Sequence, residues 1–95
     1  MEIPRLSRKE VLILSYLIDR GRSAYGLEMV KASNGLLKRG TVYVTLSRMK
    51  DKGYVDSRIE AAKKGQQGPP RRLYWATGHG IKVYSDLQRM LAVLS

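Results

Sequence analysis

The sequence has no cysteine and only one histidine, His79, among its 95 residues. The absence of cysteine excludes disulfides, thiolate metal sites and cysteine nucleophiles. A single histidine cannot form the histidine pair that many zinc sites use, and no nucleophile and base can be paired around it. We therefore expect no metal, no cofactor and no catalytic residue, and we interpret the chain as a protein that is not an enzyme.

Long apolar runs are also missing. The longest mostly apolar segment covers residues 11–18, well short of the roughly 20 residues that cross a bilayer. The N-terminus does not read as a signal peptide. We expect a cytoplasmic protein. Its length and its hydrophobic fraction of 43% predict one compact domain with a single core.

Acidic residues are few, since 8 Asp and Glu stand against 18 Lys and Arg, which gives a formal net charge of +10. A protein this basic usually has a polyanionic partner. Nucleic acid is the commonest such partner, because neutralising phosphates releases condensed counterions, and a membrane surface is the next. Composition does not choose between them, so the positions of the charges must decide.

Helical signals are clear at both ends of the chain. Ser7 and Glu10 form a capping box that begins a helix, and Gly21 ends it. Thr77 is expected to cap a final helix over residues 78–94. Both helices carry apolar residues at helical spacing over an arc wider than one small core requires.

A second helix is expected over residues 24–33, with Ser23 as its cap and the Asn-Gly pair at residues 34–35 as its end. Leu36 and Leu37, in the turn that follows, are expected to fill the core.

A third helix is expected over residues 42–52, with Gly40 or Thr41 as its N-cap and Gly53 after its end. One stripe of this helix is apolar and is expected to face the core. Its members are Val42, Leu46 and Met49. The opposite face is mostly polar or cationic.

After Gly53 the apolar pattern alternates, which predicts a strand over residues 54–60 and a partner strand over residues 73–77. Trp75 in the second strand could stack on a base or a ligand, but we interpret it as a core residue. The order helix, helix, helix, strand, loop, strand, helix is that of a winged helix-turn-helix. The predicted fold is mainly α with a small antiparallel β-hairpin (α+β), in which residues 1–77 bind DNA and residues 78–95 form a dimerisation helix within the same compact domain.

The cations lie where a winged helix meets DNA, which favours nucleic acid over a membrane surface. We therefore expect a nucleoid-associated protein without a membrane partner. Two stand at the start of the third helix, where free amides and the helix dipole favour a phosphate. Arg48 on the exposed face has the reach for a guanine edge, and Thr45 for a thymine methyl. The loop over residues 61–72 has four cations and no acid. The predicted DNA-contacting residues are Lys38, Arg39, Thr41, Tyr43, Thr45, Arg48, Lys63, Lys64, Arg71 and Arg72.

Several short motifs occur in an order typical of one family. They are Tyr25-Gly26-Leu27-Glu28-Met29, Gly40-Thr41-Val42-Tyr43, Gly53-Tyr54-Val55, Gly68-Pro69, Arg71-Arg72-Leu73-Tyr74, and Thr77 with Gly80. On these residues the sequence resembles the PadR-like transcriptional regulators, in their short form, over nearly its whole length. Other winged-helix families, such as the MarR-like regulators, share the architecture but not this combination of motifs.

The resemblance implies a homodimeric repressor that occupies an inverted-repeat operator in double-stranded DNA, with Tyr43 at the DNA. From its position alone, Tyr43 either packs under the hairpin or bonds a phosphate. The resemblance also implies that the final helix dimerises with help from the first helix, and the wide apolar arcs of both agree with this. The predicted dimerisation residues are Ile13, Tyr16, Tyr84, Leu87, Leu91 and Leu94.

The sequence departs from some relatives at the final helix, which has no tryptophan to hold a planar drug. A small-molecule effector is therefore possible but unsupported. Two other functions stay open from the sequence: a non-specific architectural DNA-binding protein, and a winged-helix module for protein interaction.

Overall fold

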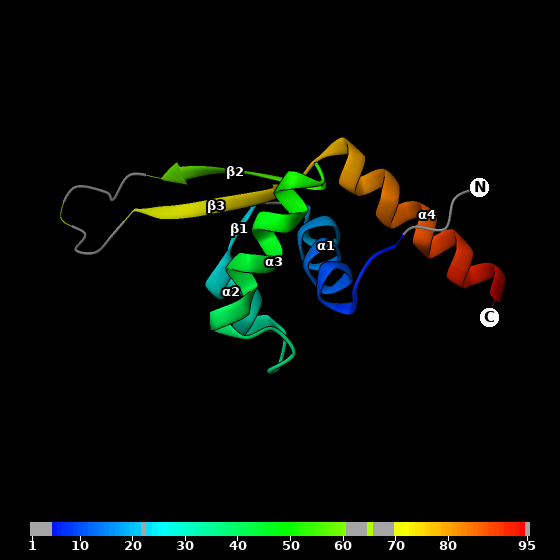
Figure 1. The fold of residues 1–95 in the computed structure, drawn as a ribbon, viewed down its shortest axis with the longest axis horizontal. Helices are drawn as coiled ribbons and strands as arrows, with labels where there is room; N and C mark the ends of the chain where they lie inside the picture. Colours follow the sequence, from blue (N-terminus) through cyan, green and yellow to red (C-terminus); the bar gives the residue numbers. More distant parts are fainter. Residues whose placement is uncertain (1–4, 22, 61–64, 66–69, 95) are drawn as a thin grey trace.

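The computed structural model describes residues 5–21, 23–60, 65 and 70–94. Within them, three helices pack around a small antiparallel sheet, and a fourth helix leaves the sheet and runs past the first (Figure 1). This architecture confirms the predicted winged helix-turn-helix. The elements are α1 (Arg8–Arg20), β1 (Ala24–Tyr25), α2 (Gly26–Ala32), α3 (Arg39–Asp51), β2 (Val55–Glu60), β3 (Arg71–Ala76) and α4 (Gly78–Leu94).

Helix α1 has the predicted capping box and C-cap. The Ser7 amide donates to the Glu10 carboxylate at 2.9 Å, and the Glu10 amide donates to the Ser7 hydroxyl at 3.2 Å. Gly21 ends the helix in the left-handed conformation, with φ of 63°, which glycine adopts without steric cost. Local sequence therefore determines both ends of α1.

The helix predicted over residues 24–33 with Ser23 as its cap was wrong at its start. Residues Ala24 and Tyr25 form strand β1, which pairs antiparallel with β3, so the sheet has the order β1-β3-β2. Tyr25, not Ser23, is the N-cap of α2, and its amide donates to the Glu28 carboxylate at 3.0 Å. A two-residue strand is too short for an alternating pattern, and its partner lies about fifty residues along the chain, so the sequence gives no local sign of it.

Helix α3 begins earlier than predicted and ends one residue earlier. Its first residue is Arg39 and its N-cap is Lys38, whose carbonyl accepts from the amides of Thr41 and Val42. Gly40 and Thr41, the predicted caps, lie inside the first turn. Leu37 is buried just before the helix, and this anchor sets the start of the helix where no side chain caps it.

The core lies between α1, α2, α3 and the sheet. Met29 and Met49 are buried, as expected for core residues. Leu37 fills the core as predicted, but Leu36 is exposed. Trp75 is half-buried and lies outside the core, so its predicted core role was wrong. The buried apolar residues are Ile13, Leu14, Leu17, Ala24, Met29, Leu37, Val42, Leu46, Met49, Val55, Tyr74 and Tyr84.

A junction of four residues joins α3, the hairpin and α4. The Thr77 hydroxyl donates to the Gly53 carbonyl and accepts from the Gly80 amide at 3.0 Å, so Thr77 caps α4 as predicted. The Thr77 amide donates to the Tyr54 carbonyl at 3.1 Å. Gly80 lies so close to this carbonyl that a Cβ atom would overlap it. The start of α4 is thereby fixed against the end of α3.

An ion pair joins the start of α1 to the end of α3. The Glu10 carboxylate is buried and accepts from the Lys52 ammonium at 2.9 Å. Burial by itself would raise the pKa of Glu10, but the hydrogen bonds from Ser7 and Lys52 outweigh it and hold this pKa below its ordinary value. The ionised carboxylate is therefore part of the folded structure.

We expect Gly80→Ala to destabilise the fold by about 2–3 kcal/mol or more, because the new methyl group meets backbone that cannot move without shifting α4. Urea unfolding at fixed protein concentration measures this. Gly78→Ala is the matched control two residues earlier in α4, where a Cβ atom meets nothing within 4 Å. It should leave stability unchanged or raise it by up to about 1 kcal/mol. Equal effects of the two substitutions would contradict the close contact.

We expect Glu10→Gln to lower the free energy of unfolding by about 1 kcal/mol at neutral pH, because glutamine can keep the capping bond but loses the charge that Lys52 faces. The folded pKa of Glu10 lies below its ordinary value of 4.5. The contribution of the Glu10 carboxylate to the free energy of unfolding is therefore fully present above the ordinary pKa, and it is lost as the pH falls through the lowered folded pKa. The difference between variant and wild type should shrink towards zero in urea titrations at decreasing pH. Asp51→Asn, at an exposed neighbour of Lys52, is the control, and a pH-independent difference for Glu10→Gln would refute the electrostatic origin.

Candidate nucleic-acid interface

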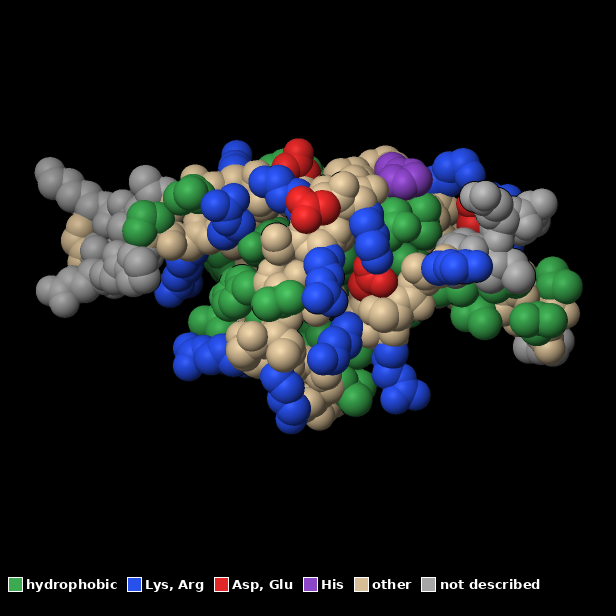
Figure 2. All heavy atoms as spheres, in the orientation of Figure 1, with side chains coloured by type: hydrophobic (Ala, Val, Ile, Leu, Met, Phe, Trp, Pro, Cys, Tyr) green, Lys and Arg blue, Asp and Glu red, His purple; other side chains and the backbone are tan. Residues whose placement is uncertain are grey.

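Helix α3 has one buried face and one open face. Val42, Leu46 and Met49 are fully buried, which confirms the predicted core stripe. On the same side as the exposed face of α3, Lys and Arg side chains gather over the helix and along the hairpin strands (Figure 2). None of the ion pairs among the described residues involves the cations Lys38, Arg39 and Arg48. These three charges are therefore available to a ligand.

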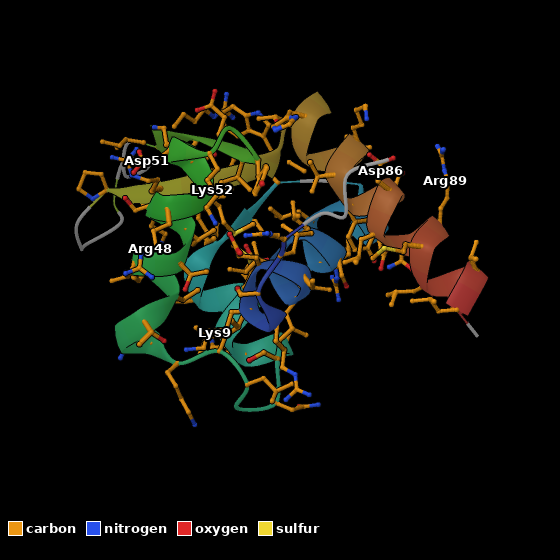
Figure 3. The ribbon with its side chains drawn as sticks, turned by 45° about the vertical axis from the view of Figure 1, so that its right-hand side comes forward. Lys9, Arg48, Asp51, Lys52, Asp86 and Arg89 are labelled. Atoms are coloured by element: carbon orange, nitrogen blue, oxygen red, sulfur yellow. The ribbon has the colours of Figure 1, made fainter. Side chains whose placement is uncertain are left out.

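A shallow groove of about 570 Å³ runs beside the exposed face of α3. Lys9 on α1 and Arg48 on α3 lie on the same side of the molecule, with Lys52 further along α3 (Figure 3). The groove contains the buried carboxylate of Glu10, but Lys52 neutralises it. Its lining residues are Ser7, Lys9, Glu10, Thr41, Val44, Thr45, Arg48 and Lys52.

The threonines of α3 use their hydroxyl groups within the helix. Thr45 donates to the Thr41 carbonyl at 3.1 Å, and Thr41 donates to the Lys38 carbonyl at 3.4 Å. Val44 beside them is half exposed. The face that Thr45 and Val44 offer to a ligand is therefore apolar, and Arg48 adds a charge to it.

Tyr43 joins α3 to α2. Its ring lies against Gly26, where a Cβ atom would come within 2.7 Å of the Tyr43 Cε1 atom. The side chain is still 44% exposed and lines a hollow of about 650 Å³ together with Tyr25, Arg71 and Arg72. The structure thus places Tyr43 on the first residue of α2, with part of the side chain open on the hairpin side.

The two arginines at the start of β3 are exposed but have partners. The Arg71 guanidinium lies over the Tyr25 ring, with its Cζ atom 5.5 Å from the ring centroid. Arg72 donates to the Ser57 hydroxyl at 3.1 Å. The other two predicted loop contacts, Lys63 and Lys64, lie outside the described residues.

Sequence reasoning missed three residues here. Lys9 lines the groove beside α3. Tyr25 donates from its hydroxyl to the Glu60 carboxylate, and this hydrogen bond, with some burial, raises the pKa of Tyr25 above its ordinary value. The only signal in the sequence was the Tyr-Gly pair at residues 25–26, because glycine allows another part of the chain to approach closely.

The predicted dimerisation residues fall into two groups. Ile13 is 0% exposed and Tyr84 is buried, so both belong to the core of their own chain, and Ile13 offers no surface to a second copy. Tyr16 and Leu87 are half-buried. Leu91 and Leu94 are 50% and 75% exposed, on the half of α4 that projects beyond the other elements (Figure 1).

Across the described part of the chain, every helix is too short or too polar to span a bilayer.

The sequence matches the "Transcriptional regulator PadR-like family" over residues 13–88. Among the curated proteins, none matches the chain. Among the solved structures, many are similar to it. A PadR family transcription regulator from hypervirulent Clostridium difficile R20291 is 25% identical, with 93% of this chain and 91% of that chain covered and a TM-score of 0.76.

A putative transcriptional regulator from Thermoplasma acidophilum is 28% identical, with 90% of this chain and 82% of that chain covered and a TM-score of 0.73. A PadR family transcriptional regulator from Eggerthella lenta DSM 2243 is 27% identical, with 90% of this chain and 72% of that chain covered and a TM-score of 0.72. The resemblance seen in the sequence motifs is therefore confirmed by the family match and by the fold. The chain belongs to the PadR-like family of transcriptional regulators.

Proposed function

We propose that the protein is a homodimeric repressor that binds an inverted-repeat operator in double-stranded DNA. The observation that carries the proposal is the exposed face of α3, where three cations that form no ion pair with any described residue stand beside an apolar patch. Residues 1–77 read the DNA in this proposal, and residues 78–95 dimerise. The protein acts on chromosomal DNA in the cytoplasm and needs no cofactor.

Helix α3 enters the major groove and reads bases through the middle of its exposed face. Arg48 is the residue that recognises a guanine edge, because its guanidinium can donate two hydrogen bonds to one base. The Thr45 hydroxyl already donates within the helix, which leaves its methyl group to contact a thymine methyl. Thr41 and Val44 complete this surface.

Backbone phosphates are bound on either side of α3. Lys38 and Arg39 stand at the start of the helix, which has no side-chain cap, so its amides and dipole favour an anion there. Tyr43, Arg71 and Arg72 line the hollow between α3 and the hairpin, and Lys63 and Lys64 lie between β2 and β3 in the sequence. Such contacts set the register of the protein on DNA without reading sequence.

The second copy is held by α4. One side of this helix is polar, with Lys82 paired to Asp86 at 3.1 Å and with Arg89 extending outward (Figure 3). The other side carries Leu87, Leu91 and Leu94. Apolar surface that projects from a small domain is stabilised by a partner, and a second copy supplies an equally apolar helix.

A dimer built on α4 explains the inverted repeat. A two-fold axis at α4 relates two copies of α3, and each copy enters a major groove about one helical turn, roughly 34 Å, from the other. The two half-sites are then related by the same axis. Repression follows from occupancy, because a dimer on its operator excludes other proteins from that DNA.

We expect a steep dependence of DNA affinity on salt, with about 0.9 log unit per log unit of salt for each phosphate contact. Duplex DNA from upstream of the gene should bind more tightly than a scrambled duplex, and the titration is followed by fluorescence anisotropy. Arg48→Ala should reduce the discrimination between the two duplexes by about 1–3 kcal/mol. Arg72→Ala should weaken binding to both duplexes alike and lower the salt slope by about 1.

Arg89→Ala is the control, because it removes the same charge from the polar side of α4. It should leave both affinities within about twofold of the wild type. Equal binding of the two duplexes by the wild type would support an architectural protein instead. A flat salt dependence would argue for a protein-interaction module.

We expect Leu91→Asp to weaken dimerisation at least about 100-fold, because the interface would then have to bury a carboxylate without a partner. Sedimentation velocity across a concentration series measures the dissociation constant. Arg89→Ala again makes the same change in net charge on the other side of α4 and should leave the dimer intact. A Leu91→Asp protein that stays dimeric would remove α4 from the interface.

A further inference from the structure

Three strands each contribute one side chain to a cluster at the loop end of the hairpin strands. Glu60 is the last residue of β2, Arg71 is the first residue of β3, and the two are opposite each other in the register of the sheet. Tyr25 on β1 is opposite Leu73, two residues from Arg71. Side chains two residues apart on a strand lie on the same face, so all three residues share one face of the sheet.

The Tyr25 side chain spans this face. Its hydroxyl donates to the Glu60 carboxylate, and its ring lies beneath the Arg71 guanidinium. Backbone pairing between β1 and β3 stops at Tyr25. Beyond this point, the Tyr25 side chain connects β1 to the loop end of the hairpin strands.

Tyr25 is also tied to the two helices of the helix-turn-helix. Its amide donates to Glu28 in the first turn of α2. The next residue, Gly26, lies beneath the ring of Tyr43 in α3. Tyr25 and its neighbour Gly26 thus link the loop end of the hairpin strands to the first turns of α2 and α3.

We propose that Tyr25 is a positioning residue that, through Glu60, holds the hairpin at a fixed angle to α3, so that helix and hairpin engage DNA as one unit. This inference rests on the proposed DNA-binding function. A two-stranded hairpin is only marginally stable by itself in water. Without the hydrogen bond between Tyr25 and Glu60, Arg71 and Arg72 reach the phosphates only after the hairpin is ordered, and that ordering costs affinity.

The role of Glu60 separates positioning from simple electrostatics. Glu60 is an acid that faces two arginines, since Arg58 also lies 3.8 Å from it. If charge alone mattered, removing this carboxylate would strengthen binding to a polyanion. If Glu60 acts as the acceptor for Tyr25, removing it weakens binding although the protein becomes more basic.

The experiment measures affinity for one duplex as a function of salt with the full chain and three variants. Tyr25→Phe removes the donor, and Glu60→Ala removes the acceptor. Both should weaken binding about three- to tenfold, the size of one net hydrogen bond, and should lower the salt slope by about 1–2 through lost phosphate contacts. Glu60→Gln keeps an oxygen that accepts from Tyr25, so it should bind as tightly as the wild type or more tightly.

Tyr54→Phe is the matched control. It makes the same chemical change at the other end of the hairpin strands, where no hydrogen bond of the Tyr54 hydroxyl occurs among the described residues. It should match the wild type in affinity and slope. Thermal unfolding of each variant tests folding, and if Tyr25→Phe is unfolded the two Glu60 variants decide the matter by themselves.

Tighter or unchanged binding by Glu60→Ala overturns the positioning role, and so does weaker binding with an unaltered salt slope. Weakening by Glu60→Gln equal to that by Glu60→Ala also overturns it, because the acceptor would then be irrelevant. A wild type that binds no duplex overturns the proposed function itself. The two failures are therefore distinguishable in one titration series.

Discussion

The arrangement of the molecule depends on the contact between the Tyr54 carbonyl and the start of α4. At this point the chain leaves α3, the hairpin begins and ends, and α4 starts, so one junction sets the direction of all three. The Thr77 hydroxyl satisfies a carbonyl on one side and an amide on the other. Gly80 allows an approach that any side chain would prevent. In the proposed dimer, α4 lies at the two-fold axis and α3 contacts the bases. The junction between them therefore sets the spacing between the two copies of α3.

Acidic residues in this basic protein are placed where they organise structure. Glu10 ties α1 to α3, Glu28 caps α2, and Glu60 accepts from Tyr25. Each carboxylate stands near a cation or an amide, so it costs little in repulsion from a polyanion. The cations at the start and middle of α3 are left without ion pairs among the described residues. The face that meets the DNA in the proposed complex therefore keeps positive charge that no carboxylate neutralises.

Local signals were enough to predict much of this fold. The capping box at Ser7, the glycine at residue 21 and the cap at Thr77 are satisfied within a few residues, so α1 and α4 have the predicted bounds. Features that depend on distant partners were not predictable. Strand β1 exists only because β3 is beside it. Trp75 lies outside the core because Tyr74 is the β3 residue that faces the core, and side chains alternate along a strand. Ile13 was assigned to the dimer because an arc on a helix does not say which part the protein's own core will cover.

The same limit explains why the exposed face of α3 was predicted better than the contacts that hold it in place. The exposure of a cation such as Arg48 can be predicted from the helical period and the apolar stripe alone, and both follow from the spacing of residues in the sequence. Tyr25 acts across three strands, so its role follows from the sheet register and not from any pattern in the sequence. Residues that contact a ligand can be predicted from which face of a helix is exposed. Residues that hold those side chains in position depend on tertiary contacts, which the sequence pattern does not show. In a chain of 95 residues with one small core, the contacts that orient the hairpin lie at the surface. In the proposed complex, Tyr25, Glu60 and Arg71 at the loop end of the hairpin strands therefore link the fold to the function.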